Sequence, residues 1–135
     1  ATLIDILESL GTNLQDFFKQ DVPEKMVFTK NDVSVKSDPE LKSEIRWLVP
    51  NAQKNAMEPI VVHLEPEGRT PYDDPHDGEE FGYVIKGQIL LHFGSEVVKV
   101  RAGESFYFPA EAGHYIANAG KRPAVVLWVS SPPSF

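Results

Sequence analysis

The sequence of 135 residues contains no cysteine. This absence excludes disulfide bonds and thiolate metal ligands, and it is compatible with a reducing compartment. The chain also lacks an apolar run of the ~20 residues that a transmembrane helix requires, and no basic, apolar leader opens it. We therefore expect a cytoplasmic protein that does not enter a membrane.

Basic residues are few and scattered. The chain has 13 Lys and Arg against 20 Asp and Glu, which gives a formal net charge of −7. Binding to nucleic acid requires clustered basic side chains that neutralise phosphates, so we expect no DNA contact from this part of the protein. A glycine-rich phosphate loop, a Gly-x-Ser-x-Gly elbow and a cysteine nucleophile are also missing, so the common nucleotide-dependent and covalent reactions lack a residue to carry them.

Short β-favouring runs separated by turn residues fill most of the chain. They lie at residues 26–29, 33–35, 45–49, 60–64, 80–85, 88–93, 97–100, 105–108, 114–118 and 124–130. Turns are expected at Lys86-Gly87 and Gly94-Ser95. About ten short strands with regularly spaced turns predict one mainly β domain, folded as a double-sheet roll or barrel.

The first twenty residues have a different period. Apolar side chains recur at three- and four-residue steps from Leu3 to Leu14, which predicts amphipathic helix, and Phe17 and Phe18 add apolar surface to a second short helix. Because this pattern begins without an initiator methionine, we expect the chain to be a fragment. The predicted division is residues 1–20 as helices, 21–58 as a linker with the leading strands, and 59–135 as the core barrel.

Two spaced patterns carry the candidate chemistry: Gly68-x5-Asp74-x-His76-x3-Glu80-x6-Gly87 and Gly103-x5-Pro109-x4-His114-x3-Asn118. On an extended strand, even spacing places side chains on one face, so Asp74, His76 and Glu80 would point the same way, as would His114 and Asn118. If the barrel closes, the two groups converge. We predict a ligand site formed by these five residues and Tyr72.

The spacing resembles the two signature motifs of the cupin family, whose fold is a double-stranded β-helix, or jelly-roll barrel. Asp74 stands where the family has its first histidine, and Glu111 where the second motif has glycine. The resemblance implies His76, Glu80 and His114 as metal ligands, with Asp74 as a substituted fourth. Such a set suits Zn, Fe, Ni or Mn, and the sequence leaves open whether a metal is bound.

A second resemblance covers most of the chain. Residues 1–18, ATLIDILESLGTNLQDFF, resemble the last helices of a phage-repressor (XRE-type) helix-turn-helix domain. The stretch GEEFGYVIKG and the closing SPPSF are similar to polyamine-responsive repressors of that group. This implies a sensor domain that binds a small-molecule effector, with DNA bound by a missing N-terminal domain. We expect a homodimer, because a cupin sheet edge can pair with the same edge of a second copy and regulators that read two half-sites need a dimer. Buried carboxylates suit a cationic polyamine, whereas a bound metal would suit an anionic effector.

Other interpretations stay open. Two histidines and a carboxylate could serve a metal-dependent cupin enzyme of dioxygenase or isomerase type, and a barrel with an idle pocket is a third possibility. Acidic runs are usually solvated, and within this one we expect Asp73, Asp77 and Glu79 to face solvent. His63 and His92 have no assigned role. Aromatic residues are expected in the core or an interface, with one or two lining the pocket: Trp47, Tyr72, Tyr83, Phe106 and Tyr107.

Overall fold

The computed structural model describes residues 25–135, so the helices predicted for residues 1–20 lie outside the described residues. The described part is mainly β, which confirms the predicted fold class. Its elements are η1 (Lys30–Asp32), β1 (Ser34–Asp38), β2 (Ser43–Trp47), η2 (Ala52–Lys54), β3 (Glu58–Leu64), β4 (Glu79–Lys86), β5 (Gln88–Phe93), β6 (Glu96–Arg101), β7 (Ser105–Pro109), β8 (His114–Ala117) and β9 (Ala124–Ser131). Within residues 25–135, no helix is long and apolar enough to span a membrane.

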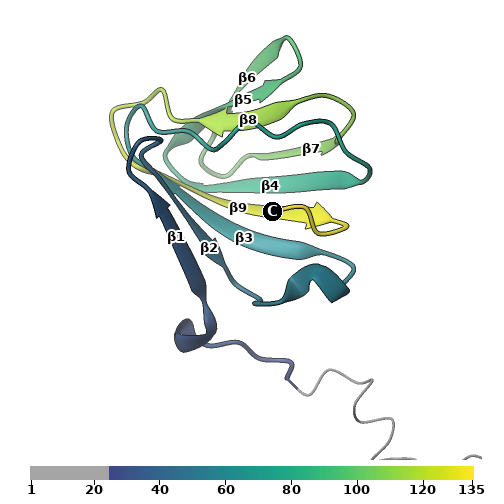
Figure 1. Cartoon of the computed structure of the whole chain (residues 1–135). Helices are drawn as coiled ribbons and strands as arrows, with labels where there is room; N and C mark the ends of the chain where they lie inside the picture. The colour runs from purple at the N-terminus through teal and green to yellow at the C-terminus, as the bar shows by residue number, and fades with distance from the viewer. Residues whose placement is uncertain (1–24) are drawn as a thin grey trace, which may run out of the picture.

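Two antiparallel sheets form the barrel. The larger sheet has the order β1-β2-β3-β9-β4-β7, and the smaller has the order β6-β5-β8. Figure 1 shows β9 between β3 and β4, with β5, β6 and β8 stacked beyond β7. β9 follows β8 in the chain but joins the other sheet, so the connection at residues 118–123 passes from one layer to the other.

Strict alternation places the core between the sheets. In β3, β4 and β9, every second side chain is buried, as expected for strands with one face toward a core. The core side chains include Ile60, Val62, Leu64, Val84, Ile89, Leu91, Phe106, Phe108, Ile116, Val126 and Trp128. The polar Glu80 and His114 occupy inward-facing positions of their strands, so the fold buries both side chains among the core residues.

The segment between β3 and β4 crosses from one sheet to the other. Arg69 and Asp73 form isolated antiparallel bridges with Ala117 and His114 of β8. Residues 69–73 therefore run beside the exposed edge of the small sheet before the chain returns to β4. This crossing closes one side of the barrel and brings the first motif against the second.

The predicted strands and the observed ones differ mainly at the start. Residues 26–29 are not a strand, because Thr29 caps the short helix η1 through its side chain. β1 instead runs on to Asp38, beyond the strand predicted for residues 33–35, and pairs with β2. The turns at Gly87 and Gly94 form as predicted, and both glycines have positive φ, which favours glycine.

Candidate metal and effector site

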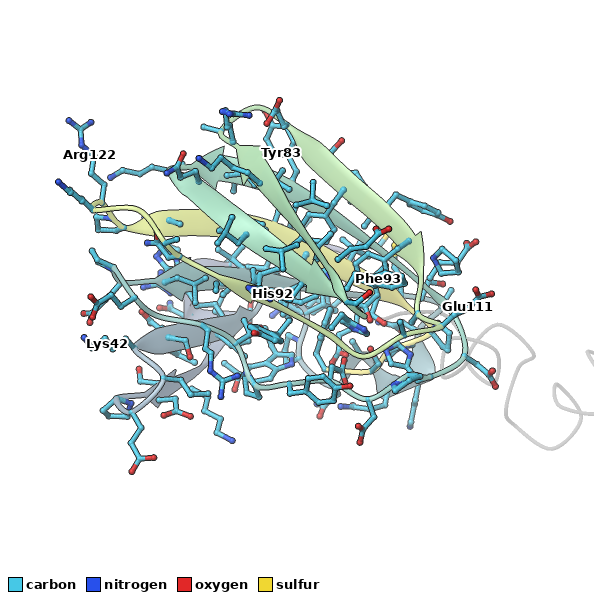
Figure 2. All side chains as sticks on the ribbon, turned by 90° about the horizontal axis from the view of Figure 1, so that it is seen from above. Lys42, Tyr83, His92, Phe93, Glu111 and Arg122 are labelled. Atoms are coloured by element: carbon cyan, nitrogen blue, oxygen red, sulfur yellow. The ribbon has the colours of Figure 1, made fainter. Side chains whose placement is uncertain are left out.

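Four side chains meet at one end of the barrel: Asp73, His76, Glu80 and His114. Each offers one ligand atom, and these atoms all lie within 4.8 Å of one another. Figure 2 shows Glu111 and Lys42 at opposite ends of the molecule. The cluster belongs to the Glu111 end, near Phe93, whose ring centroid lies 6.5 Å from that of His114.

Different elements hold the four groups. Glu80 is the second residue of β4 and points inward, and His114 opens β8; both side chains are fully buried. His76 lies in the loop before β4, where its backbone N–H donates to the carbonyl of Ala110. Gly78 permits the tight return into β4, because a Cβ atom there would collide with the backbone of Ser131 and its φ is +108°.

Hydrogen bonds fix the orientation of both imidazoles. Nδ1 of His76 lies 2.8 Å from the carbonyl oxygen of Asp77, and Nδ1 of His114 lies 2.9 Å from that of Ala112. A carbonyl oxygen only accepts, so each Nδ1 carries the proton that it donates. In a neutral ring, Nε2 then presents a lone pair, which is the form that binds a metal.

Both Nε2 atoms face the same carboxylate oxygen. Oε2 of Glu80 lies 2.8 Å from Nε2 of His76 and 2.9 Å from Nε2 of His114. Two ring lone pairs cannot face a carboxylate oxygen without positive charge between them, so the cluster takes up either protons or a cation. Oε1 of Glu80 is buried and has no hydrogen-bond partner within residues 25–135, which leaves further acceptor capacity at this point.

The donor set therefore fits a divalent cation. Two imidazoles and a carboxylate of fixed orientation match zinc, iron, nickel and manganese chemistry, and the Oδ2 atom of Asp73 lies 3.3 Å from Nε2 of His114 as a fourth oxygen. The two carbonyl groups that hold the Nδ1 atoms correspond to the outer contacts that orient metal-bound histidines in other proteins.

Burial and charge alter the acidity of two of these groups. Burial raises the pKa of Asp73 above its usual value, Glu80 raises it further, and the neighbouring histidines oppose both effects. Burial alone would lower the pKa of His114, but the hydrogen bond to Glu80, the Ala112 carbonyl and the charge of Asp73 together raise it. The surroundings of Asp73 and His114 thus favour bound positive charge, either as a proton or as a cation.

An apolar cavity of about 180 Å³ lies next to the cluster. Its walls come from β2, β3, β9, the crossing segment and the last residues of the chain: Ile45, Trp47, Ile60, Thr70, Pro71, Tyr72, Asp73, Trp128, Ser134 and Phe135. Asp73 belongs to both the cavity wall and the cluster. The indole N–H of Trp128 is buried and has no acceptor within the described residues. An apolar cavity with a few polar groups at its edge is the usual form of a small-molecule site.

Of the six residues predicted to bind ligand, the structure brings together His76, Glu80 and His114. The expectation that Asp74 points inward and Asp73 outward is wrong: Asp74 is exposed, and Asp73 takes its place. Even spacing predicts a common face only along a strand, and residues 71–78 form no strand. The bridge to His114 instead directs Asp73 into the site.

Asn118 and Tyr72, which were also predicted to bind ligand, lie outside the four-residue cluster. Asn118 is buried, and its amide donates to the carbonyls of Leu64 and Arg122 and accepts from the N–H of Gly120, so its hydrogen bonds hold the turn before β9. Tyr72 lines the cavity, although its side chain is largely exposed. A Cβ atom at Gly113 would collide with the Tyr72 ring, so the absence of a side chain there lets the ring pack over the loop before His114.

Trp128 and Phe135 were not predicted as site residues. Trp128 occupies an inward position in an apolar strand, and such a position reads as ordinary core. Phe135 packs on it with ring centroids 5.2 Å apart. Only the fold shows that both side chains border a cavity.

Comparisons with known proteins agree with this architecture. An uncharacterized protein of Methanocaldococcus jannaschii is 31% identical over 93 residues, which cover 67% of this chain and 74% of that protein. The HTH-type transcriptional regulator PuuR of Escherichia coli is 24% identical over an alignment that covers 100% of this chain and 74% of the regulator.

Solved structures show the same fold at lower identity. The cupin domain of an XRE family transcriptional regulator from Enterobacter cloacae superposes with a TM-score of 0.61 at 18% identity, covering 69% of this chain and 99% of that domain. A predicted oxalate decarboxylase from Thermotoga maritima gives 0.66 at 21% identity, covering 78% of this chain and 98% of the other. The family model for the cupin domain matches residues 60–130, just over half of the sequence, and the chain belongs to the cupin domain family.

Proposed function

We propose that this chain is the effector-sensing part of a DNA-binding transcriptional regulator. The alignment with PuuR supports this, because it extends over the whole chain and so includes the residues before the barrel. The likeness to the cupin domain of the Enterobacter cloacae regulator adds a structural precedent. In this proposal, residues 1–20 end a helix-turn-helix domain, residues 21–58 connect it, and residues 59–135 form the sensor, which works as a homodimer in the cytoplasm.

The position of Asp73 carries the sensing role. Asp73 belongs to both the polar cluster and the wall of the apolar cavity, so a molecule in the cavity lies beside one of the four groups of the cluster. A ligand in this place would change the local charge and the packing of the crossing segment together. Such a change can couple to DNA binding when the effector prefers one state of the dimer, typically by ~1–3 kcal/mol.

The cavity favours a small cationic or zwitterionic effector. Asp73 in the cavity wall and Glu80 in the adjacent cluster supply negative charge, and the aromatic side chains of Trp47, Tyr72 and Trp128 line the cavity, a composition that suits an ammonium group. A volume of about 180 Å³ is below the ~300–1,000 Å³ of drug-sized sites, so the ligand is a small metabolite. A polyamine meets the charge requirement, and an amino acid would in addition offer an acceptor to the Trp128 indole.

A titration tests this proposal. The purified chain, freed of metal with a chelator and in parallel loaded with zinc, is titrated by calorimetry with putrescine, spermidine and several amino acids. Saturable heat with one of these compounds, at one site per chain, supports an effector domain. Absence of heat with every cation, in both metal states, would eliminate the polyamine form of the proposal.

The second candidate is a metal-dependent enzyme, which the convergence of two Nε2 atoms and Glu80 Oε2 favours. His76, Glu80 and His114, with Asp73, would hold the ion, which would act as a Lewis acid or bind oxygen when present. The fold likeness to a predicted oxalate decarboxylase is compatible with this candidate. Elemental analysis separates the two: stoichiometric iron or manganese in protein prepared without chelator favours catalysis, whereas no metal, or zinc alone, favours sensing.

A further inference from the structure

The outward face of the large sheet is apolar where solvent contact would favour polar residues. An antiparallel sheet with one solvated face normally alternates apolar and polar side chains. β9 instead reads AVVLWVSS, which is the nearly continuous apolar run of a strand covered on both faces. Its inward side chains lie in the core, yet Val125, Leu127 and Val129 on the other face are only partly buried.

Two cross-strand rows extend this apolar surface, the first over four strands and the second over three. The first row runs through Pro59, Val129, Phe81 and Tyr107, which are aligned by the strand register. Phe81 remains 38% exposed and Tyr107 61% exposed. Large aromatic side chains on an open sheet face are costly to leave in water and are enriched at protein interfaces.

The second row lies beside the first, at the next outward-facing position of each strand. It joins Val61, Leu127 and Tyr83, and Tyr83 is 41% exposed. The two rows together form what we call the outer apolar face. Its margins are polar, with Arg46 and Glu44 ion-paired on β2 and Glu79 at the start of β4. An apolar centre with a polar rim is the usual composition of a specific interface.

We propose that the outer apolar face binds the same face of a second copy of this chain. The proposal refines the homodimer of the proposed function by locating its interface. Counted together with its polar rim, this surface spans four strands spaced ~4.8 Å apart and at most the eight residues of β4 at ~3.3 Å each, which gives roughly 500 Å² per copy. Two copies would cover ~1,000 Å², which is at the lower limit of specific interfaces.

Charge favours a second copy as the occupant. β4 begins with Glu79 and ends with Lys86, so a two-fold axis across the strands sets the acidic end of one copy against the basic end of the other. The edges of the sheets are poorer candidates. The edge strand β1 carries Lys36 and Asp38, and the edge strand β7 ends in Pro109; charged residues and proline are the features that protect an edge from pairing.

The test is sedimentation equilibrium of the 135-residue chain and of two matched lysine variants. Tyr83→Lys places a charge in the outer apolar face, whereas Val97→Lys places one on the exposed part of β6 in the other sheet. We expect the wild type and Val97→Lys to sediment as dimers, with a mass of twice 15.1 kDa. The dimer of Tyr83→Lys should dissociate at protein concentrations at least 10-fold higher than those at which the wild-type dimer dissociates. Circular dichroism verifies that each variant is folded.

A second measurement covers a variant that fails to fold. Since the chain has no cysteine, Tyr83→Cys and Val97→Cys each introduce one reporter thiol. Alkylation of residue 83 should slow as protein concentration rises, while residue 97 keeps its rate. A monomeric wild type at all concentrations overturns both the dimer and its interface. If Tyr83→Lys dimerises like the wild type, and if alkylation of residue 83 does not depend on protein concentration, the proposed interface is wrong. The homodimer itself is not contradicted by that result.

Discussion

Asp73 and His114 lie opposite each other in an isolated antiparallel bridge, in which each backbone N–H donates to the other residue's carbonyl at 2.9 Å. The bridge sets their side chains on the same side, so Oδ2 of Asp73 lies 3.3 Å from Nε2 of His114. One pair of backbone hydrogen bonds thus joins the two sequence motifs and determines which aspartate enters the site.

Glu80 should control cation binding. Its Oε2 contacts both imidazoles, so Glu80→Gln removes the negative charge that draws a cation between them. We expect zinc affinity to fall ~10-fold or more, since hydrogen bonds and ion contacts of charged groups contribute ~1.5–3 kcal/mol. Competition with a chromogenic chelator measures the change. Glu111→Gln, an exposed neighbour of the site, serves as control and should bind like wild type; equal loss in both variants would contradict the assignment.

Asn118 should matter for folding and leave ligand affinity unchanged. Its buried amide makes three hydrogen bonds to backbone groups, and Asn118→Ala would leave these groups unsatisfied. We expect a loss of ~2–4 kcal/mol in the free energy of unfolding, measured by urea denaturation. Asn55→Ala, at an exposed position, should cost less than ~0.5 kcal/mol. Weakened ligand binding in folded Asn118→Ala, with little change in stability, would instead restore its predicted role as a ligand contact.

His63 should make stability depend on pH. Burial, aided by the positive charge of Arg46, lowers the pKa of His63 below its ordinary value, and Glu44 opposes this. As the pH falls through ~6.5, the unfolded chain takes up this proton before the folded one, so the free energy of unfolding decreases. Wild type should therefore lose more stability than His63→Gln between about pH 8 and about pH 5. Parallel denaturant midpoints for the two proteins over this range would refute the assignment.

Sequence patterns predicted the fold class and the meeting of two distant segments. Regular turn signals and short apolar runs are local features, and β-hairpins such as the one at Gly87 follow from them. The spacing of His76 and Glu80 also pointed to one site, which the structure brings together with His114. The choice between Asp73 and Asp74 failed because it assumed an extended strand, whereas a single long-range bridge orients that segment.

The cavity could not be predicted, because its walls come from five separate parts of the chain. Trp128 looks like core in the sequence, and the lack of an acceptor for its indole N–H among residues 25–135 is visible only once its neighbours are placed. The apolar residues on the outward face of β9 were visible in the sequence, but an apolar run alone does not tell which of the two faces is open. Cavities and open faces are properties of the packed sheets, so they require the structure.

The most direct test compares two adjacent aspartates in one titration. Asp73 lies in the cluster and the cavity wall, whereas Asp74 is exposed, and both changes to asparagine remove one charge from the same loop. With the compound that binds wild type, calorimetry should show Asp73→Asn weakened ~10-fold or more and Asp74→Asn within about 2-fold of wild type. Equal affinities for the two variants, or a greater loss at Asp74, would contradict the claim that the cluster and the cavity form one receptor.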